Sequence, residues 1–334
     1  MVQIKRRADR TDDETREAAW IRKASTKGLR QGLGTIRALT SEPTRLVNGR
    51  GREIAVDADG VDWVVVVIVD HDDPPEDLFV EKTGSVPQVV LLRRDWEFLF
   101  DQLRSTRAVV QYLKRAAEAD PIELGREPVR YYRLAAADAA TPPSPLDPRI
   151  IGEGTPISTP LLPQAPVAAD ADGFHRLLRT ILEDIATSPV ADEIEESRLS
   201  VLSEIDRLPV AHRSELGKLL LEMLNDVAAV DASETKWRFR RFRFAPPEPQ
   251  LEFGACSRFS ELHMEAFRQW VTLRHHEFGA DLGTYEGVAT VGVLLTPRDD
   301  GLRPWDTTMV RAEGDFELTD EELRGLEELW NRPE

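Results

Sequence analysis

The sequence predicts a multi-domain protein in which an α/β N-terminal domain is followed by a helical segment and an α+β C-terminal region. Three observations indicate this class. Strand-like and helix-like segments alternate up to about residue 135, eight prolines fall within 140–170, and helical apolar periodicity dominates 171–230. The expected parts are an α/β nuclease-like domain over 1–138, a Pro/Ala-rich linker over 139–170, a helical segment over 171–230 and an α+β domain over 231–334.

The elements of the N-terminal domain are predicted from short apolar runs and from side chains that cap helices. Strands are expected at 1–7, 52–56, 61–69 and 88–92, the second and third being consecutive and joined by a turn. Helices are expected from Asp12 or Asp13 to about Lys23, from Ser25 to Leu39, after Asp95, and after Ser105 or Thr106. The run at 61–69 is apolar on both faces, which predicts a central strand in a covered sheet. Three glycines, at 28, 32 and 34, weaken the second helix but allow close approach to a sheet or a ligand.

The remaining elements follow from the same signals. Apolar residues recur at offsets of 0, 3, 4, 7, 8 and 11 from Phe174 and again from Leu216, and a third amphipathic segment runs from about Ile194 to Leu208. Three such helices with short connections predict a small helical bundle. Beyond them, strands are expected at 237–244, 288–295 and 307–311, and helices from Ser260 to about Glu277 and after Thr319.

Composition and charge limit the class of function. The net charge of −17 argues against general affinity for nucleic acid, but residues 1–60 carry 13 Lys and Arg against 9 Asp and Glu. This basic region is where contact with DNA is expected, while the helical and C-terminal regions are candidates for binding protein partners. The single cysteine, Cys256, excludes a disulfide framework and a multi-cysteine zinc site, and is expected to be a buried small residue. The longest apolar run, Val64–Val69, is too short to span a bilayer, and no signal-peptide pattern opens the chain, so a cytoplasmic protein without a membrane partner is expected.

The motif that points most directly to chemistry is Gln3-x-Lys5 in the first strand. Alternate residues of a strand face the same side of a sheet, so Gln3 and Lys5 are expected to point together into one cleft. Metal-dependent cleavage of a phosphodiester needs oxygen ligands for Mg²⁺ and a cation near the attacking water or the scissile phosphate. Gln3 would offer an amide oxygen to the ion, and Lys5 would offer its charge to the phosphate. The competing interpretation is an exposed edge strand with a solvated lysine.

With this strand, the basic helix after it and the later segment Lys27-x-x-x-Gln31, residues 1–40 resemble the PD-(D/E)XK superfamily of restriction-endonuclease-like nucleases. The likeness is to branches in which Gln replaces the acidic residue before x-Lys. It implies a restriction-endonuclease-like core, truncated at its start, and metal-dependent cleavage of DNA. It also implies that Gln3, Lys5 and Gln31 lie in the active site and that Mg²⁺ is the cofactor. The resemblance covers about 40 of the 334 residues.

The chain departs from that family at the metal-binding acidic residue, which the family carries on a strand before the x-Lys strand. Met1 stands two residues before Gln3. Three explanations stay open: an upstream segment supplies the acid, the following helix supplies it through Glu14 or Glu17, or the site is inactive. The predicted function is a metal-dependent nuclease-like protein that acts on or binds DNA, with Gln3 and Glu17 as candidate metal ligands. The alternative is a non-catalytic protein-interaction or regulatory protein.

Two groups of histidines and carboxylates are weaker candidates for a metal site. Asp70-His71-Asp72-Asp73 follows a buried strand, where α/β proteins often bind ligands, but the two prolines after it favour an acidic solvated turn. His275-His276-Glu277 and His263 lack the i, i+3 or i, i+4 spacing of a helical metal pair. The C-terminus of a helix also favours cationic His electrostatically, which explains the pair without a metal.

Residues 237–244 alternate aromatic and arginine side chains, which predicts rings on one strand face and guanidiniums on the other. Such a ribbon would suit single-stranded nucleic acid, because rings stack on bases and arginines pair with phosphates. The favoured interpretation is that the rings pack in the core while the arginines face water or acidic neighbours.

Overall fold

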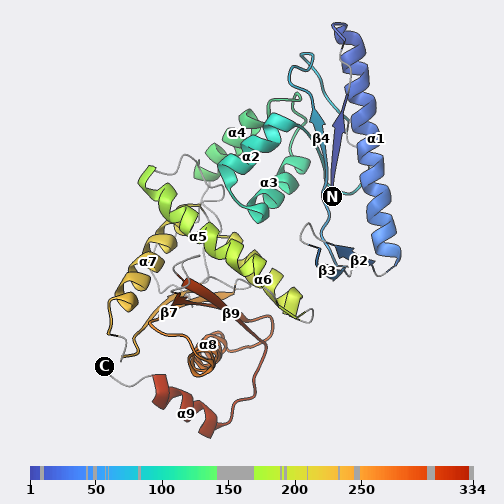
Figure 1. Cartoon of the computed structure of the whole chain (residues 1–334). Helices are drawn as coiled ribbons and strands as arrows, with labels where there is room; N and C mark the ends of the chain where they lie inside the picture. The colour runs from blue at the N-terminus through green and yellow to red at the C-terminus, as the bar shows by residue number, and fades with distance from the viewer. Residues whose placement is uncertain are drawn as a thin grey trace. The chain divides into compact units, whose positions relative to one another are not determined.

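The chain divides into two compact units in the computed structural model shown in Figure 1. The structure describes residues 1–7, 11–42, 44–47, 51–56, 58, 60–81, 84–140, 169–188, 190–191, 194–208, 210–231, 234–243, 249–298 and 305–330. Most of the expected linker at 139–170 therefore lies outside the described residues. Both units combine helices with β-sheet, so the mixed α/β character predicted from the sequence is present.

The first unit is built on a three-stranded parallel sheet with the strand order β1-β4-β5. Its elements are β1 (Val2–Arg6), α1 (Glu14–Ser41), β2 (Thr44–Val47), β3 (Glu53–Val56), β4 (Val65–Asp70), β5 (Gln88–Leu92), α2 (Arg93–Leu103), α3 (Thr106–Glu118) and α4 (Glu127–Ala140). The register pairs Val2 with Val66, so β1 lies beside a strand more than sixty residues further along the chain. β2 and β3 form a separate antiparallel hairpin.

Helices cover both faces of this sheet. Long helix α1 packs on one face, and α2, α3 and α4 pack on the other (Figure 1). Alternate residues of β4 therefore enter two different cores: Val65 and Val67 contact the α1 side, while Val66 and Ile68 contact the side of α2 to α4. The prediction of a central strand buried on both faces is confirmed for β4.

Two details of the first unit differ from the sequence-based expectation. The two helices predicted around Lys23 and Ser25 are one continuous helix, because no Gly or Pro interrupts residues 14–27 and Ser25 is buried inside α1 instead of capping a helix. The strand at 53–56 pairs with β2 and not with β4, because Thr44–Val47, which was not predicted as a strand, lies shortly before it in the chain.

The second unit contains a four-stranded mixed sheet with the order β6-β7-β8-β9. Its elements are α5 (Ala169–Thr187), α6 (Glu195–Asp206), α7 (Val210–Ala228), β6 (Trp237–Phe242), β7 (Gln250–Cys256), α8 (Glu261–Leu282), β8 (Ala289–Pro297), β9 (Trp305–Glu313) and α9 (Asp320–Trp330). The inner pair β7 and β8 is parallel and both outer pairs are antiparallel. The predicted caps are present, since Ser260 accepts a hydrogen bond from the backbone N–H of His263 and Thr319 from that of Glu322.

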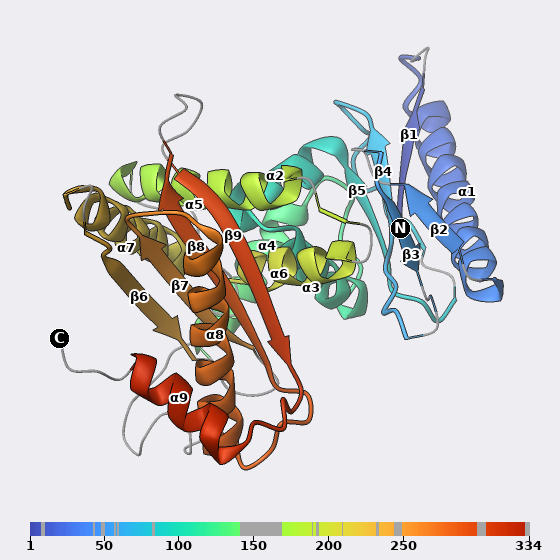
Figure 2. The same cartoon turned by 60° about the horizontal axis from the view of Figure 1, so that its bottom comes forward.

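The helices of the second unit share a core with its sheet. Leu178 of α5, Leu220 of α7, Phe253 of β7 and Val293 of β8 belong to one buried cluster, so 171–230 and the strands that follow lie in a single unit. Helix α8 packs on the face of the sheet opposite to α5 and α7, and α9 contacts α8 (Figure 2). Helix α9 contains no buried residue, and among the described aromatic contacts the ring of Trp330 at its last position lies against Trp237, Phe239 and Trp270. In the part of the chain that the structure describes, no helix combines the length and apolar character needed to cross a bilayer.

Two glycines of α1 provide a matched test of how tightly this helix packs. A Cβ on Gly32 would lie 2.4 Å from Cγ1 of Val65, whereas a Cβ on Gly34 would meet nothing within 4 Å. We expect Gly32→Ala to lower the free energy of unfolding by about 1–3 kcal/mol through overpacking. Gly34→Ala should raise it by up to about 1 kcal/mol, because alanine loses less backbone entropy in a helix. Urea unfolding of both variants measures this, and equal effects would contradict the close contact between α1 and β4.

Candidate functional site

The candidate site lies where α1 packs against β1, and glycine determines how close the two elements come. A Cβ on Gly28 would lie 2.9 Å from Cγ2 of Val67 and 3.0 Å from Cε of Lys5. Real Cβ atoms rarely approach that closely, so the absence of a side chain at Gly28 leaves room for the Lys5 stem. The sequence-based expectation that these glycines allow close approach to a sheet is thus realised at Gly28 and Gly32.

The structure brings Lys5 and Gln31 together. Nζ of Lys5 donates a hydrogen bond of 2.5 Å to Oε1 of Gln31 on α1, across 26 residues of sequence. Gln3 and Lys5 are both half-buried, whereas Val2, Ile4 and Arg6 between and beside them are exposed. This alternation places Gln3 and Lys5 on the face of β1 that α1 covers. The three residues predicted from the motif therefore lie on neighbouring elements, with one direct bond between them.

Glu17, the other predicted metal ligand, is engaged elsewhere. Its Oε1 accepts hydrogen bonds from Nη1 of Arg7 at 2.7 Å and from the backbone N–H of Thr11 at 2.9 Å. Its Oε2 lies 3.1 Å from Nε2 of His71, which must carry the proton because a carboxylate only accepts. Arg7 is four residues beyond Gln3, roughly 13 Å along an extended chain, so Glu17 interacts beyond the carboxyl end of β1 and not beside Gln3.

These contacts determine the charge state of Glu17. Burial raises the pKa of its carboxyl group, but the hydrogen bonds from Thr11 and His71 and the charge of Arg7 more than offset this, and the pKa lies below its usual value. Glu17 and His71 are both almost fully buried. Trp20 lies against this group, with its ring 6.5 Å from that of His71 and 5.9 Å from the Arg7 guanidinium. The group joins the start of α1 to the end of β4 and is a structural clamp.

The residues present do not fit a Mg²⁺ site. Mg²⁺ prefers carboxylate oxygens, and the amide oxygen of Gln3 alone is a weak ligand. Both oxygens of Glu17 are already occupied by Arg7, Thr11 and His71. Across the described ranges, no three His, Cys, Asp or Glu side chains gather closely enough to hold a metal ion.

The segment Asp70-His71-Asp72-Asp73 does not act as one group. Asp70 lies 3.5 Å from Nε of Arg6 and 3.9 Å from Nη1 of Arg93, while His71 turns inward to Glu17. The residues that pair with Asp70 lie on β1 and α2, and the residue that pairs with His71 lies on α1, so the two side chains have separate surroundings. Sequence reasoning missed the pair of Glu17 and His71 because 54 residues separate them, although the position of His71 at the carboxyl end of a buried strand was a signal for it.

The histidines of α8 serve the packing of the second unit. Nε2 of His275 donates to the carbonyl of Gly314 at 2.7 Å, and its Nδ1 lies 3.0 Å from Oγ1 of Thr290. Burial lowers the pKa of His275. His276 contacts the hydroxyl of Tyr285 at 2.7 Å, and His263 contacts Ser260 at 2.7 Å. The explanation through a helix C-terminus was wrong, because α8 continues to Leu282 and His275 and His276 lie inside it.

The aromatic and arginine ribbon has a different arrangement from the one predicted. Arg240 and Arg241 are adjacent, and this doublet shifts the phase of the alternation, so each face of β6 carries both rings and guanidiniums. Trp237 and Phe239 lie against α8 and α9, while Phe242 packs with α7 in the other core. Three of the arginines pair with carboxylates of this unit: Arg238 with Asp226, Arg241 with Glu252 and Glu277, and Arg243 with Asp281. The interpretation as core rings with paired arginines is confirmed for the described part, and Phe244 lies outside it.

One buried carboxylate of this network is unusual. Glu252 of β7 is fully buried, with Oε1 2.7 Å from Nε of Arg241 and Oε2 accepting a hydrogen bond of 3.3 Å from Nε1 of Trp270. Burial raises the pKa of Glu252 to about 7, although the charge of Arg241 lowers it in part. Cys256, at the end of the same strand, is buried as expected, and burial raises the pKa of its thiol.

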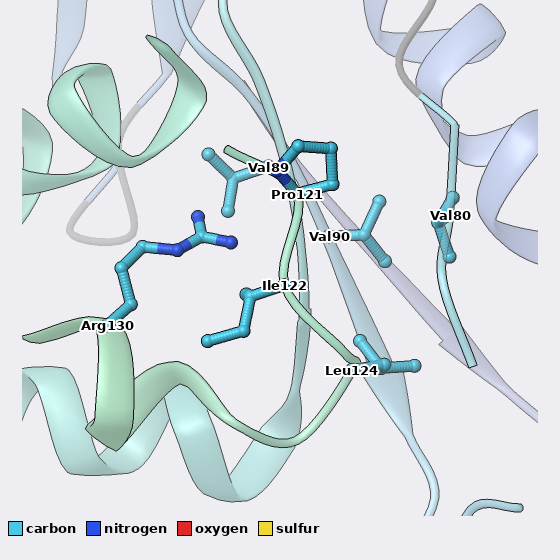
Figure 3. A pocket seen from close by; sticks show the side chains of 7 residues that line it. All are labelled: Val80, Val89, Val90, Pro121, Ile122, Leu124 and Arg130. Carbon is cyan, nitrogen blue, oxygen red and sulfur yellow. The ribbon is translucent and has the colours of Figure 1, made fainter. Parts of the chain in front are cut away.

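A small cavity lies at the outer edge of β5 (Figure 3). Its walls are apolar apart from Arg130, and its volume is about 30 Å³. A cavity of this size holds roughly one or two water molecules and no substrate. Nη1 of Arg130 donates to the carbonyl of Ala116 at 2.9 Å, which fixes the side chain as part of the wall.

The chain has no significant match among protein family models, curated proteins or solved structures. The resemblance of residues 1–40 to PD-(D/E)XK nucleases therefore stays a prediction from the motif.

The lowered pKa of Glu17 predicts a pH effect on stability. Its contribution is fully present above the unfolded-state pKa and is lost as the pH falls through the lower folded-state pKa. We expect Glu17→Gln to destabilise the protein clearly at pH 5.5 and less at pH 3.5. Exposed Glu14, in the same helical turn, is the matched control, and Glu14→Gln should have a small effect at both pH values. Urea unfolding measures this, and an equal loss for Glu17→Gln at both pH values would contradict the clamp.

The raised pKa of Glu252 predicts the opposite dependence of stability on pH. Its folded-state pKa of about 7 lies above the unfolded value, so ionisation opposes folding and stability falls as the pH rises from about 4.5 to 7. This contribution is at most about 3 kcal/mol. Glu252→Gln should remove that part of the slope of unfolding free energy against pH, whereas Glu286→Gln on the surface should leave it unchanged. Identical slopes in Glu252→Gln and the unsubstituted protein would show that burial does not raise the pKa of Glu252.

Proposed function

We propose that the first unit acts on or binds DNA as a nuclease-like domain of a cytoplasmic protein, with Lys5 as the residue that contacts a backbone phosphate. The observation that supports this most is the hydrogen bond between Lys5 and Gln31. It joins the strand and helix positions that the PD-(D/E)XK resemblance singles out, on elements that follow each other in the order which that resemblance implies.

The chemistry of the three side chains suits an anion. The ammonium of Lys5 has three donors, one of which is directed at Gln31, and the others are available to a phosphate oxygen. The amide groups of Gln3 and Gln31 add further donors near that position. If the unit cleaves DNA, Lys5 would stabilise the negative charge that develops on the phosphate.

The alternative is a non-catalytic protein that binds partners. The observation that favours it is the state of Glu17, whose two oxygens are both engaged by neighbouring groups of the same unit. On this interpretation Lys5 and Gln31 either contact a binding partner or are ordinary surface residues, and the first unit has no catalytic residue.

Nicking of supercoiled plasmid with Mg²⁺ or Mn²⁺ separates the two proposals. If the unit is a nuclease, Lys5→Ala should reduce the nicking rate at least about 100-fold, because the loss of one preorganised cation at the phosphate has an effect of that size. Lys218→Ala is the control, since Lys218 is an exposed lysine of the second unit. Equal nicking by the Lys5→Ala and Lys218→Ala variants would remove Lys5 from the mechanism, and no metal-dependent nicking by the unsubstituted protein would favour the alternative.

A further inference from the structure

Helix α1 carries a line of positive charge on its outer face. Lys23, Lys27, Arg30 and Arg37 are all exposed, and at 3.6 residues per turn they fall within a sector of roughly 80°. The buried residues of α1, which include Ile21, lie on the opposite side of the helix. These four residues, called the cationic stripe below, extend over roughly 21 Å of helix axis, at a rise of about 1.5 Å per residue.

The stripe lacks the carboxylates that accompany arginines on other helices of this protein. Residues 18–41 contain no Asp or Glu, and within the described ranges none of the four cations forms an ion pair. By contrast, exposed arginines elsewhere pair with a carboxylate three or four residues away on their own helix: Arg93 with Glu97, Arg176 with Asp172, and Arg268 with Glu265. Four such cations in a row without neighbouring carboxylates contrast with a chain whose net charge is −17.

This arrangement is unfavourable for the isolated helix. Lys23 and Lys27 are spaced at i, i+4, and Lys27 and Arg30 at i, i+3, so like charges lie on adjacent turns. Pairs of this kind destabilise a helix by about 0.2–0.5 kcal/mol each. A polyanion alongside α1 would turn this repulsion into attraction, because each cation would approach a phosphate and release a counterion.

We propose that the cationic stripe is a binding surface for the phosphate backbone of double-stranded DNA. The inference rests on the proposed function for its choice of DNA as the partner, but it requires neither cleavage nor a metal. Gln31, which accepts the hydrogen bond from Lys5, lies on α1 between the cations at 27–30 and 37. A duplex that follows the stripe would therefore pass close to Lys5, and the stripe would hold the substrate while Lys5 contacts one phosphate.

The side chains around the stripe argue against other polyanions. Binding of single strands relies on aromatic platforms, and Trp20, the one aromatic residue of α1, is half-buried against His71 and Arg7. Binding at a membrane surface relies on exposed apolar residues beside the cations, and no large exposed hydrophobic residue lies on α1. A rigid duplex is the polyanion that matches a straight row of charges without either feature.

The test measures binding of a fluorescent 30-base-pair duplex in EDTA, where metal-dependent nicking cannot contribute. Four phosphate contacts predict that the logarithm of the association constant falls with the logarithm of salt concentration with a slope of about −3.6, or roughly 100-fold weaker binding between 50 and 200 mM salt. A variant with all four cations changed to Gln should lose most of this slope and bind at least about tenfold more weakly at 100 mM salt. The control changes four exposed cations of the second unit, Arg179, Lys218, Arg240 and Arg324, to Gln and should bind as the unsubstituted protein does.

The outcomes separate this inference from the proposed function. Equal binding by the stripe variant and the control variant would overturn the inference, even if Lys5-dependent nicking were observed. Preference for a single-stranded oligonucleotide, or binding to anionic lipid vesicles without binding to DNA, would overturn it as well. Loss of duplex binding in the stripe variant alone, with its thermal unfolding unchanged, would support it even if no nicking occurs.

Discussion

The close packing of α1 on β1 and β4 is the constraint on which the first unit depends. Gly28 and Gly32 let the helix backbone approach Val67 and Val65 at distances that a Cβ would not permit. This approach fixes Gln31 beside Lys5, and it places the first turn of α1 where Glu17 can reach His71. It also determines which side of α1 faces solvent. The geometry of the candidate site and the direction of the cationic stripe therefore follow from two positions without side chains.

Positive and negative side chains are distributed differently in the two units, and the net charge does not show this difference. The second unit pairs its arginines with its own carboxylates, as the contacts of Arg238, Arg241 and Arg243 show. The outer face of α1 has no such partners among the described residues. A net charge of −17 therefore does not describe what a ligand meets at each surface. The pKa values of the two buried carboxylates also depend on their local surroundings. Hydrogen-bond donors lower the pKa of Glu17 despite its burial, whereas burial raises the pKa of Glu252 despite the nearby cation.

Much of the fold could be predicted from local signals, whereas long-range contacts could not. The apolar run at 88–92, the Ser105 and Ser260 caps and the doubly buried β4 depend on neighbouring residues, and each is present. The break expected at Ser25 was wrong, because a serine inside a helical run caps nothing unless the chain is interrupted there. β7 was not identified, since its buried polar residues Gln250 and Glu252 hide the apolar pattern of a strand. At the site, spacing predicted the shared face of Gln3 and Lys5, but the partners of Glu17 depend on tertiary contacts that no spacing shows.

The parallel pairing of β1 with β4 has a consequence for how the molecule forms. Val2 pairs with Val66, so this contact closes a loop that includes α1 and the β2–β3 hairpin. Contacts between residues so distant in sequence are slow to form, because chain entropy is lost before the pairing energy is gained. We expect the helix and the hairpin to form early and the first strand to dock late. Lys5 would then acquire its surroundings only in the final stage of folding, and a partly folded chain would be without the site while retaining most of its helices.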